Sequence, residues 1–221
     1  MPPTVLHEMR IDLHVHTRRY SACAEGLNPD RLPERMAQAG IDGLVITEHD
    51  YLWSREDIAR LNRGLNKGRI YRGVEVSSCN GHFVVIGLQT LSGIARGIDI
   101  SSLVQLARVQ EAAIIWAHPQ QCYSNTAAPC TFMHLPDNID AVEVASSITE
   151  GERSREAMAM ADRMGWAQVG GSDAHILKQV GCAVTRFESL PADESALAKA
   201  IRSGRCTAQR MTIPDEAKAA P

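Results

Sequence analysis

The first half of the chain alternates short apolar runs with amphipathic segments. A sheet of parallel strands connected by helices produces this pattern, because the strands are buried and each helix covers the sheet with one face. The predicted strands are 10–15, 43–47 and 70–76, and the predicted helices between them are 31–39 and 54–61. Another strand-like run, 81–88, begins at Asn80-Gly81, which is a strong hairpin signal. A hairpin therefore interrupts the alternation at this point.

The alternation resumes after the hairpin and continues to the last predicted helix. The predicted helices are 102–110, 152–164 and 193–202, and the predicted strands are 112–117, 141–145, 167–170 and 181–185. About seven parallel strands with intervening helices indicate an α/β fold that can close into a TIM-like barrel, although with one strand fewer than usual. We expect a single barrel domain over 1–213 and a disordered tail over 214–221.

The composition excludes several classes of protein. A formal net charge of −3 and a pI near 6.2 argue against a basic face for nucleic acid or membrane, so no stable nucleic-acid complex is expected. No apolar run approaches the roughly 20 residues of a membrane-spanning helix. The six cysteines form no CxxC pair, which fits a reducing cytoplasm. An anion that binds to this chain must be captured locally.

Histidines and carboxylates gather where the predicted strands end. His14 and His16 are two residues apart on the first strand, so their side chains point to the same face. In a barrel of parallel strands the carboxyl ends converge on one rim, which brings residues from distant parts of the sequence together. The further candidates at that rim are His49, Glu75, His82, His118, Asp173 and His175. Buried ionisable groups are costly unless they are paired or bound to metal, so this pattern predicts a metal cluster.

These motifs resemble those of the polymerase and histidinol phosphatase family, the PHP domains. The resemblance runs from Asp12 to about Thr185 and rests on Asp12-Leu13-His14-Val15-His16, Thr47-Glu48-His49-Asp50, Gly73-Val74-Glu75, Ala117-His118-Pro119 and Gly171-Ser172-Asp173-Ala174-His175. It implies a distorted seven-stranded (β/α) barrel that holds two or three divalent ions, commonly Zn, Mn or Fe. It also implies phosphoester hydrolysis as the usual activity.

The resemblance also implies which residues hold each ion. The first ion takes His14, His16, Glu75 and Asp173, and the second takes Glu75, His82 and His118. The third takes His49, His175 and a residue from the loop after the first strand. Relatives often carry Asp or His in that loop, whereas this chain offers only Cys23 or Glu25 as a replacement. Glu48, Asp12 and Asp50 are expected to orient the ligand imidazoles by hydrogen bonds to the ring nitrogen that does not bind the ion.

The expected activity is that of a metal-dependent phosphoric ester hydrolase acting on a small phosphate ester. Two or three divalent ions outweigh the ligand carboxylates and make a pocket for phosphate, where a water activated by the ions attacks in line. The candidates for proton transfer are Asp173 and His175, and the candidates for substrate contact are Arg18, Arg19 and Arg153. The substrate is a small phosphomonoester, a nucleotide or a short oligonucleotide; the motifs do not choose among them.

Two alternatives stay open. An amidohydrolase-like barrel also begins with His-x-His but normally has a carbamylated lysine on a middle strand, where this chain has Glu75. A PHP module that binds metal or a partner without turnover has the same ligands and lacks only the activity. A phosphatase assay with metal-chelated controls separates these possibilities.

Overall fold

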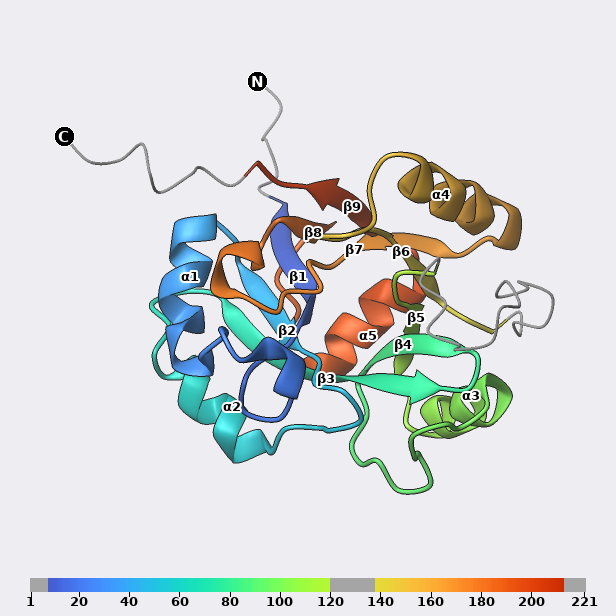
Figure 1. Cartoon of the computed structure of the whole chain (residues 1–221), viewed down its shortest axis with the longest axis horizontal. Helices are drawn as coiled ribbons and strands as arrows, with labels where there is room; N and C mark the ends of the chain where they lie inside the picture. Colours follow the sequence, from blue (N-terminus) through green and yellow to red (C-terminus); the bar gives the residue numbers. More distant parts are fainter. Residues whose placement is uncertain (1–7, 120–137, 213–221) are drawn as a thin grey trace.

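The computed structural model describes residues 8–119 and 138–212, so the expected tail over 214–221 lies outside the described residues (Figure 1). Nine strands form one sheet in the order β7-β6-β5-β4-β3-β2-β1-β8-β9. The strands are β1 (Met9–Val15), β2 (Gly43–Ile46), β3 (Arg69–Ser78), β4 (Gly81–Ile86), β5 (Ala113–Trp116), β6 (Ala141–Ala145), β7 (Ala167–Gly170), β8 (Ala183–Phe187) and β9 (Thr207–Arg210). The extent of the domain, 1–213, stays a prediction.

Five α-helices lie close to their predicted positions. They are α1 (Leu32–Ala39), α2 (Arg55–Asn62), α3 (Ile100–Val109), α4 (Glu152–Met164) and α5 (Glu194–Arg202). Three of them begin at a side chain that accepts a hydrogen bond from the first turn, namely Ser54, Asp99 and Asp193. Within the described ranges, no helix has the length and apolar character needed to cross a membrane.

Strand directions agree with the prediction at the hairpin and differ from it at the last predicted strand. The strands β1, β2 and β3 are parallel, as are β5, β6 and β7, but the hairpin makes β4 antiparallel to both of its neighbours. The strand expected at 181–185 is also antiparallel to its neighbour β1. The connection from β7 to β8 holds only a short 3-10 turn, Leu177–Gln179, whereas a parallel return needs a crossover that is usually a helix.

The sheet curls until its two halves nearly close a barrel (Figure 1). The first half of β1 pairs with β8, while its end pairs with the segment after β7 through a parallel bridge between Val15 and Ala174. Farther down, the Thr185 hydroxyl accepts from Gly170 N at 2.9 Å and donates to Gly170 O at 2.8 Å. These contacts confirm an α/β fold of the distorted TIM-like barrel type.

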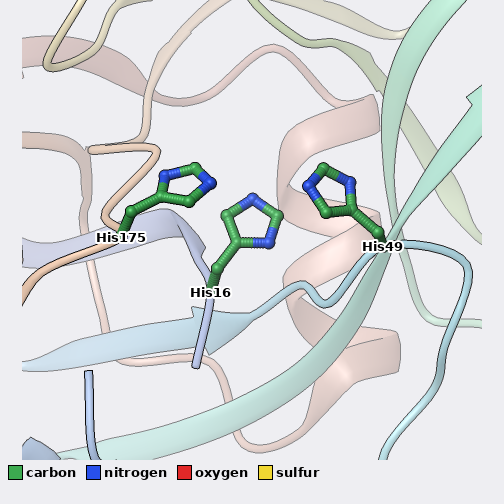
Figure 2. Close-up of side chains that lie close together, drawn as sticks. All are labelled: His16, His49 and His175. Carbon is green, nitrogen blue, oxygen red and sulfur yellow. The ribbon is translucent and has the colours of Figure 1, made fainter. Parts of the chain in front are cut away.

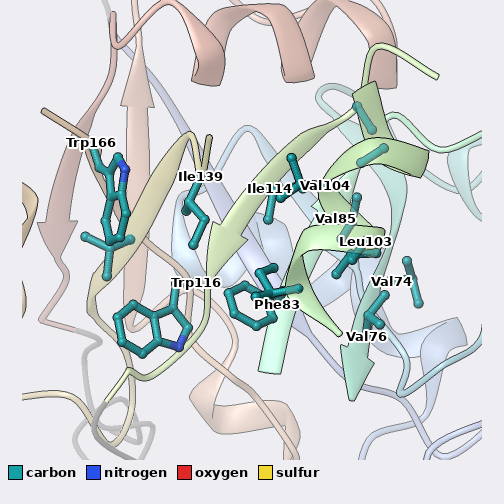
Figure 3. Close-up of a cluster of buried hydrophobic side chains, with 14 of the residues drawn as sticks. Val74, Val76, Phe83, Val85, Leu103, Val104, Ile114, Trp116, Ile139 and Trp166 are labelled. Carbon is teal, nitrogen blue, oxygen red and sulfur yellow. The ribbon is translucent and has the colours of Figure 1, made fainter. Parts of the chain in front are cut away.

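Alternate residues of the strands form an inner and an outer apolar layer. On β4, Val84 and Ile86 belong to the inner cluster, which also includes the buried face of α5. Phe83 and Val85 belong to an outer cluster, together with residues of α3 and α4 (Figure 3). Strand geometry dictates this period of two. Both apolar layers lie along the strands, so the rim at the carboxyl ends of the parallel strands is left for polar groups.

Replacing Thr185 with Val should weaken the closure of the barrel. The substitution keeps the shape of the side chain but leaves the N–H and C=O of Gly170 without this partner in a buried position. We expect the free energy of unfolding to fall by about 1–3 kcal/mol, measured by denaturant titration. The matched control is Thr207→Val at an exposed position of β9, which should change stability by less than about 0.5 kcal/mol. Equal effects of the two substitutions would contradict this role of Thr185.

Candidate metal centre

All eight predicted ligand residues lie at one rim of the barrel. His14 is on β1, Glu75 is on β3, and His16, His49, His118, Asp173 and His175 follow the ends of β1, β2, β5 and β7. His82 is near the start of β4, and because this strand is antiparallel its start lies at the same rim. The structure therefore brings together residues that are up to 161 positions apart, from His14 to His175.

A local irregularity of β1 turns its histidines inward. Leu13 packs in the inner cluster whereas Val15 packs in an outer one, so strict alternation would send His14 outward. The pairing of β1 with β2 shifts register between Asp12 and Val15, which adds one residue to the strand at this point. Such bulges re-aim side chains next to functional sites.

The carboxylate of Glu75 lies at the centre of the cluster and is fully buried. Five imidazole nitrogens surround it at 2.9–3.5 Å, on His14, His16, His49, His82 and His118. Oε1 faces His82 and His118, whereas Oε2 faces the other three. Oε2 has no hydrogen bond of good geometry despite this crowding. An oxygen placed among imidazoles in this way is suited to bridging two cations.

Asp173 supplies the second carboxylate. Its Oδ1 lies 3.5 Å from Nε2 of His14 and 3.3 Å from Nε2 of His16, and these two nitrogens are 3.1 Å apart. His175 is held by its own segment, since its Nδ1 lies 3.0 Å from the Asp173 carbonyl oxygen and donates to it. The Nε2 atom of His175 is then left to accept a proton or bind an ion.

The ligand atoms form four groups of three within 4.8 Å of one another. The groups are His14-His16-Glu75, His14-His118-Asp173, His49-Glu75-His82 and His16-His49-His175. In the last group the ring of His16 lies between the other two, with centroid distances of 4.5 Å to His49 and 4.6 Å to His175 (Figure 2). His16 thus joins His49 and His175, the two residues that the resemblance implied for a third ion. Cys23 and Glu25 are exposed, and neither belongs to a group among the described residues.

The charges of the cluster stabilise one another. Burial opposes ionisation of Glu75, but the neighbouring histidines, His14 first, hold its pKa well below the ordinary value. Burial likewise lowers the pKa of His14, yet Asp173 and Glu75 raise it well above normal in the net balance. The pKa of Asp173 is lowered by His14 and His16 against the effect of burial. The pKa of His175 is lowered by burial and by His16.

Glu48 orders the loop after β1 and is not a member of any ligand group. Its buried carboxylate accepts from the N–H and hydroxyl of Thr17 at 3.1 and 2.5 Å, from the Ser21 hydroxyl at 2.5 Å and from Trp53 Nε1 at 3.0 Å. Ser21 Oγ lies 3.4 Å from Nδ1 of His16. Glu48 therefore positions His16 through Ser21.

Asp12 fastens β1 to the segment that carries Asp173 and His175. Its Oδ1 accepts from Ser172 N at 2.7 Å and its Oδ2 accepts from Gly181 N at 2.8 Å. Burial raises the pKa of this carboxyl to about 6. Asp50 has a related role on the other side, where it accepts from Ser77 N at 2.8 Å.

The backbone is strained at two of the ligands. His118 has φ of 28° and Asp173 has φ of 52°, values that residues with a β-carbon rarely adopt. Conformations of this kind cost about 1–3 kcal/mol and persist where the surroundings impose them, typically at functional sites.

Glu143 is a member of the centre that sequence reasoning missed. It lies on β6, it is buried, and its Oε2 is 2.9 Å from Nδ1 of His14. The sequence contained a signal, because Glu143 is the one charged residue within the apolar strand Ala141–Ala145. A carboxylate behind an imidazole fixes its tautomer and directs Nε2 toward the centre.

The three arginines predicted to contact substrate are exposed, and their role stays a prediction. Arg18 and Arg19 lie in the loop directly after β1, and Arg153 is the second residue of α4. The Arg19 guanidinium lies 5.6 Å from the ring centroid of Tyr20.

Several known proteins are similar to this chain in sequence or in fold. Residues 151–206 match a family model described as PHP-associated. An uncharacterized protein of Methanocaldococcus jannaschii is 28% identical over 188 residues, which are 82% of this chain and 72% of that protein. A two-domain Bacteroides vulgatus protein containing a predicted PHP-like metal-dependent phosphoesterase has a TM-score of 0.66 at 18% identity, over 92% of this chain and 65% of that one.

Two further solved structures have the same fold. The lesion-specific endonuclease Q of Pyrococcus furiosus has a TM-score of 0.61 at 15% identity, over 91% of this chain and 57% of the endonuclease. An amidohydrolase from Chromobacterium violaceum has a TM-score of 0.60 at 17% identity, over 94% of this chain and 99% of that one. The chain thus spans less than two thirds of the Bacteroides and Pyrococcus proteins.

The fold and the cluster define a barrel protein with a ligand set suited to divalent ions. The chain matches the PHP-associated model over residues 151–206 and shares its fold with a protein that contains a predicted PHP-like phosphoesterase.

Replacing Glu143 with Gln should weaken metal binding without unfolding the barrel. The amide keeps the shape but removes the charge that holds His14 Nδ1 protonated. We expect metal affinity to fall by about 10–100-fold, measured by competition with a chelator. The matched control is Glu152→Gln at the exposed start of α4, which should leave affinity unchanged. Unchanged affinity in Glu143→Gln would remove this residue from the centre.

Proposed function

We propose that the chain is a metal-dependent hydrolase, and more narrowly a phosphoesterase that cleaves a small phosphate ester. The observation that carries the proposal is the buried Glu75 carboxylate among five imidazoles. The PHP-like metal-dependent phosphoesterase and the other hydrolases that share the fold support the broader statement. A cytoplasmic location, inferred from the cysteines, remains part of the proposal.

The donor set fits divalent transition metals. Imidazole nitrogen and carboxylate oxygen together suit Zn, Mn or Fe better than Mg or Ca, which prefer oxygen alone. The atom Glu75 Oε2 lacks a well-formed hydrogen bond although it is buried, as expected of an atom that binds a cation. We propose two or three such ions, held by the four ligand groups, which share His14, His16, His49 and Glu75.

The residues of the chain prepare the reaction by holding charge and protons in place. Bound ions would supply the positive charge that holds the phosphoryl oxygens, activates the attacking water and offsets charge on the leaving oxygen. Asp173 is ionised at neutral pH because its pKa is lowered, and His175 is neutral because its pKa is lowered too. The ionised Asp173 carboxylate has no proton to donate, and the Nδ1 proton of His175 is held by the Asp173 carbonyl oxygen. We therefore propose that both residues act as ligands or proton acceptors and that solvent protonates the leaving group.

The amidohydrolase alternative receives less support from the centre. The position expected for a carbamylated lysine is occupied by Glu75, whose carboxylate is already surrounded by imidazoles. The fold is shared with an amidohydrolase and with endonuclease Q alike, so a panel that contains phosphomonoesters, an abasic oligonucleotide and amides decides between these substrate classes.

Glu75→Gln and Asp173→Asn should each reduce phosphoester hydrolysis by about 100-fold or more, since each removes a ligand charge and not core packing. The measurement is turnover of a phosphomonoester together with metal content by elemental analysis and circular dichroism. The control is Glu56→Gln on the exposed side of α2, which should match the parent protein. Parent-level turnover in either variant would remove that residue from the reaction. A parent protein that takes up no Zn, Mn or Fe would overturn the proposed function.

Titration of metal into stripped protein should reveal two tight equivalents and one looser equivalent. The group His16-His49-His175 is the one without a carboxylate among the described groups, and it shares both His16 and His49 with other groups, so it offers the weakest set of ligands. Calorimetric or spectroscopic titration measures the stoichiometry. Three equally tight equivalents would show that the loop supplies a further ligand, and Cys23→Ser would test whether the thiolate is that ligand.

A further inference from the structure

Two tyrosines form a stacked pair on the surface next to the metal centre. The rings of Tyr20 and Tyr51 have centroids 3.8 Å apart and an interplanar angle of 26°. Their exposed fractions are 37% and 38%, and they are the only exposed large aromatic side chains within the described ranges. A large aromatic ring gains free energy when it leaves water, so two such rings exposed side by side at a rim indicate a surface that binds a ligand.

The stacked pair belongs to the rim that carries the metal ligands. Tyr51 is two residues beyond His49, so its Cα is within about 7 Å of the His49 Cα. Tyr20 directly precedes Ser21, whose Oγ lies 3.4 Å from His16 Nδ1 and accepts from the backbone N–H of His49 at 3.4 Å. Both rings therefore come from the two loops that also position His16 and His49.

The loops that carry the pair are held rigidly. The Glu48 carboxylate accepts hydrogen bonds from Thr17 and Ser21 in one loop and from the Trp53 indole in the other. The buried Trp53 ring packs edge-on against Tyr20 at 5.4 Å, and the Arg19 guanidinium lies 5.6 Å from the Tyr20 centroid. A preorganised aromatic surface binds a flat group with little loss of conformational entropy.

Tyr51 is partly exposed and stacks on one partner only among the described residues. Tyr20 is engaged by Tyr51 and by Arg19. In the part of the chain that the structure describes, Tyr51 makes no aromatic or guanidinium stacking contact other than the one with Tyr20. A planar group would extend the stack on Tyr51, one loop away from the centre where a phosphate would bind.

We propose that Tyr51, supported by Tyr20 and Arg19, binds the nucleobase of a nucleotide substrate while its phosphate lies at the metal centre. This proposal rests on the proposed function and names the substrate class for that site. Stacking does not depend on the identity of the base, because every base has a π-face, so the site discriminates nucleotides from aliphatic phosphates and not one base from another. A stacking subsite also suits an acidic chain, since it needs no extended basic face.

The test compares two substrates that differ only in the base, adenosine 5′-monophosphate and ribose 5-phosphate. The ratio of their kcat/KM values is unaffected by the fraction of folded or metal-loaded enzyme, because both are measured on the same preparation. We expect the ratio to exceed about 10 in the parent protein and to fall by about tenfold in Tyr51→Leu. Tyr51→Phe, which keeps the ring, should retain the parent ratio. A ratio near one in the parent, or an equal ratio in Tyr51→Leu, overturns the proposal.

A binding measurement separates this proposal from the proposed function. Adenosine lacks the phosphate, and its binding to the metal-loaded protein is measured by calorimetry without any turnover. Affinity that falls about tenfold in Tyr51→Leu and persists in Tyr51→Phe supports the stacking site even when neither phosphate is hydrolysed. Hydrolysis of both phosphates without adenosine binding leaves the proposed function standing and overturns the nucleobase site.

Discussion

The arrangement of this chain depends on a carboxylate buried among imidazoles. Glu75 has no exposed surface, and an ionised carboxylate without partners in such a place costs several kcal/mol or more. The compensating groups are five imidazoles, which lie on β1 and directly after it, on β4, and after β2 and β5, so no single hairpin or βαβ unit can supply them. Only a sheet that has curled into a barrel brings these groups to one carboxylate, which couples the geometry of the centre to the closure of the fold.

The same groups that build the centre also close the barrel. Asp12 precedes the histidines of β1 and accepts hydrogen bonds from Ser172 and Gly181, on either side of the segment that carries Asp173 and His175. The bridge between Val15 and Ala174 lies directly beside Asp173. Asp173 adopts a positive φ, which is unfavourable for a residue with a β-carbon. This strained conformation lets the segment run along β1 while the carboxylate points inward.

The sequence predicted the elements well and their spatial relations less completely. Period and capping signals are local, so the helices lay close to their predicted ranges, and Asn80-Gly81 marked the hairpin. The direction of β8 and the short, mostly exposed strand β9 depend on how the chain returns after β7, which no local pattern records. The candidate ligands could be predicted because strand ends converge. The contact of Glu143 with His14 and the sharing of His16 depend on how distant strands come together and on the bulge in β1, so the sequence could at most mark Glu143 as a charged residue in an apolar strand.

The charge of the centre explains how an acidic chain can bind an anion at one point. Glu75, Asp173 and Glu143 bring three carboxyl groups into a buried space. Burial opposes a charge on His14, but Asp173 and Glu75 raise its pKa well above the ordinary value, which favours a proton on this imidazole. Divalent ions compete with such protons for the same nitrogen atoms, and two ions already exceed the charge of the three carboxylates. In the proposed function, the attraction for phosphate arises from the bound ions and is confined to the rim. In that proposal, charge holds the phosphate without distinguishing the group attached to it, and the stacked rings of Tyr20 and Tyr51 beside the centre would supply part of the selection among phosphate esters.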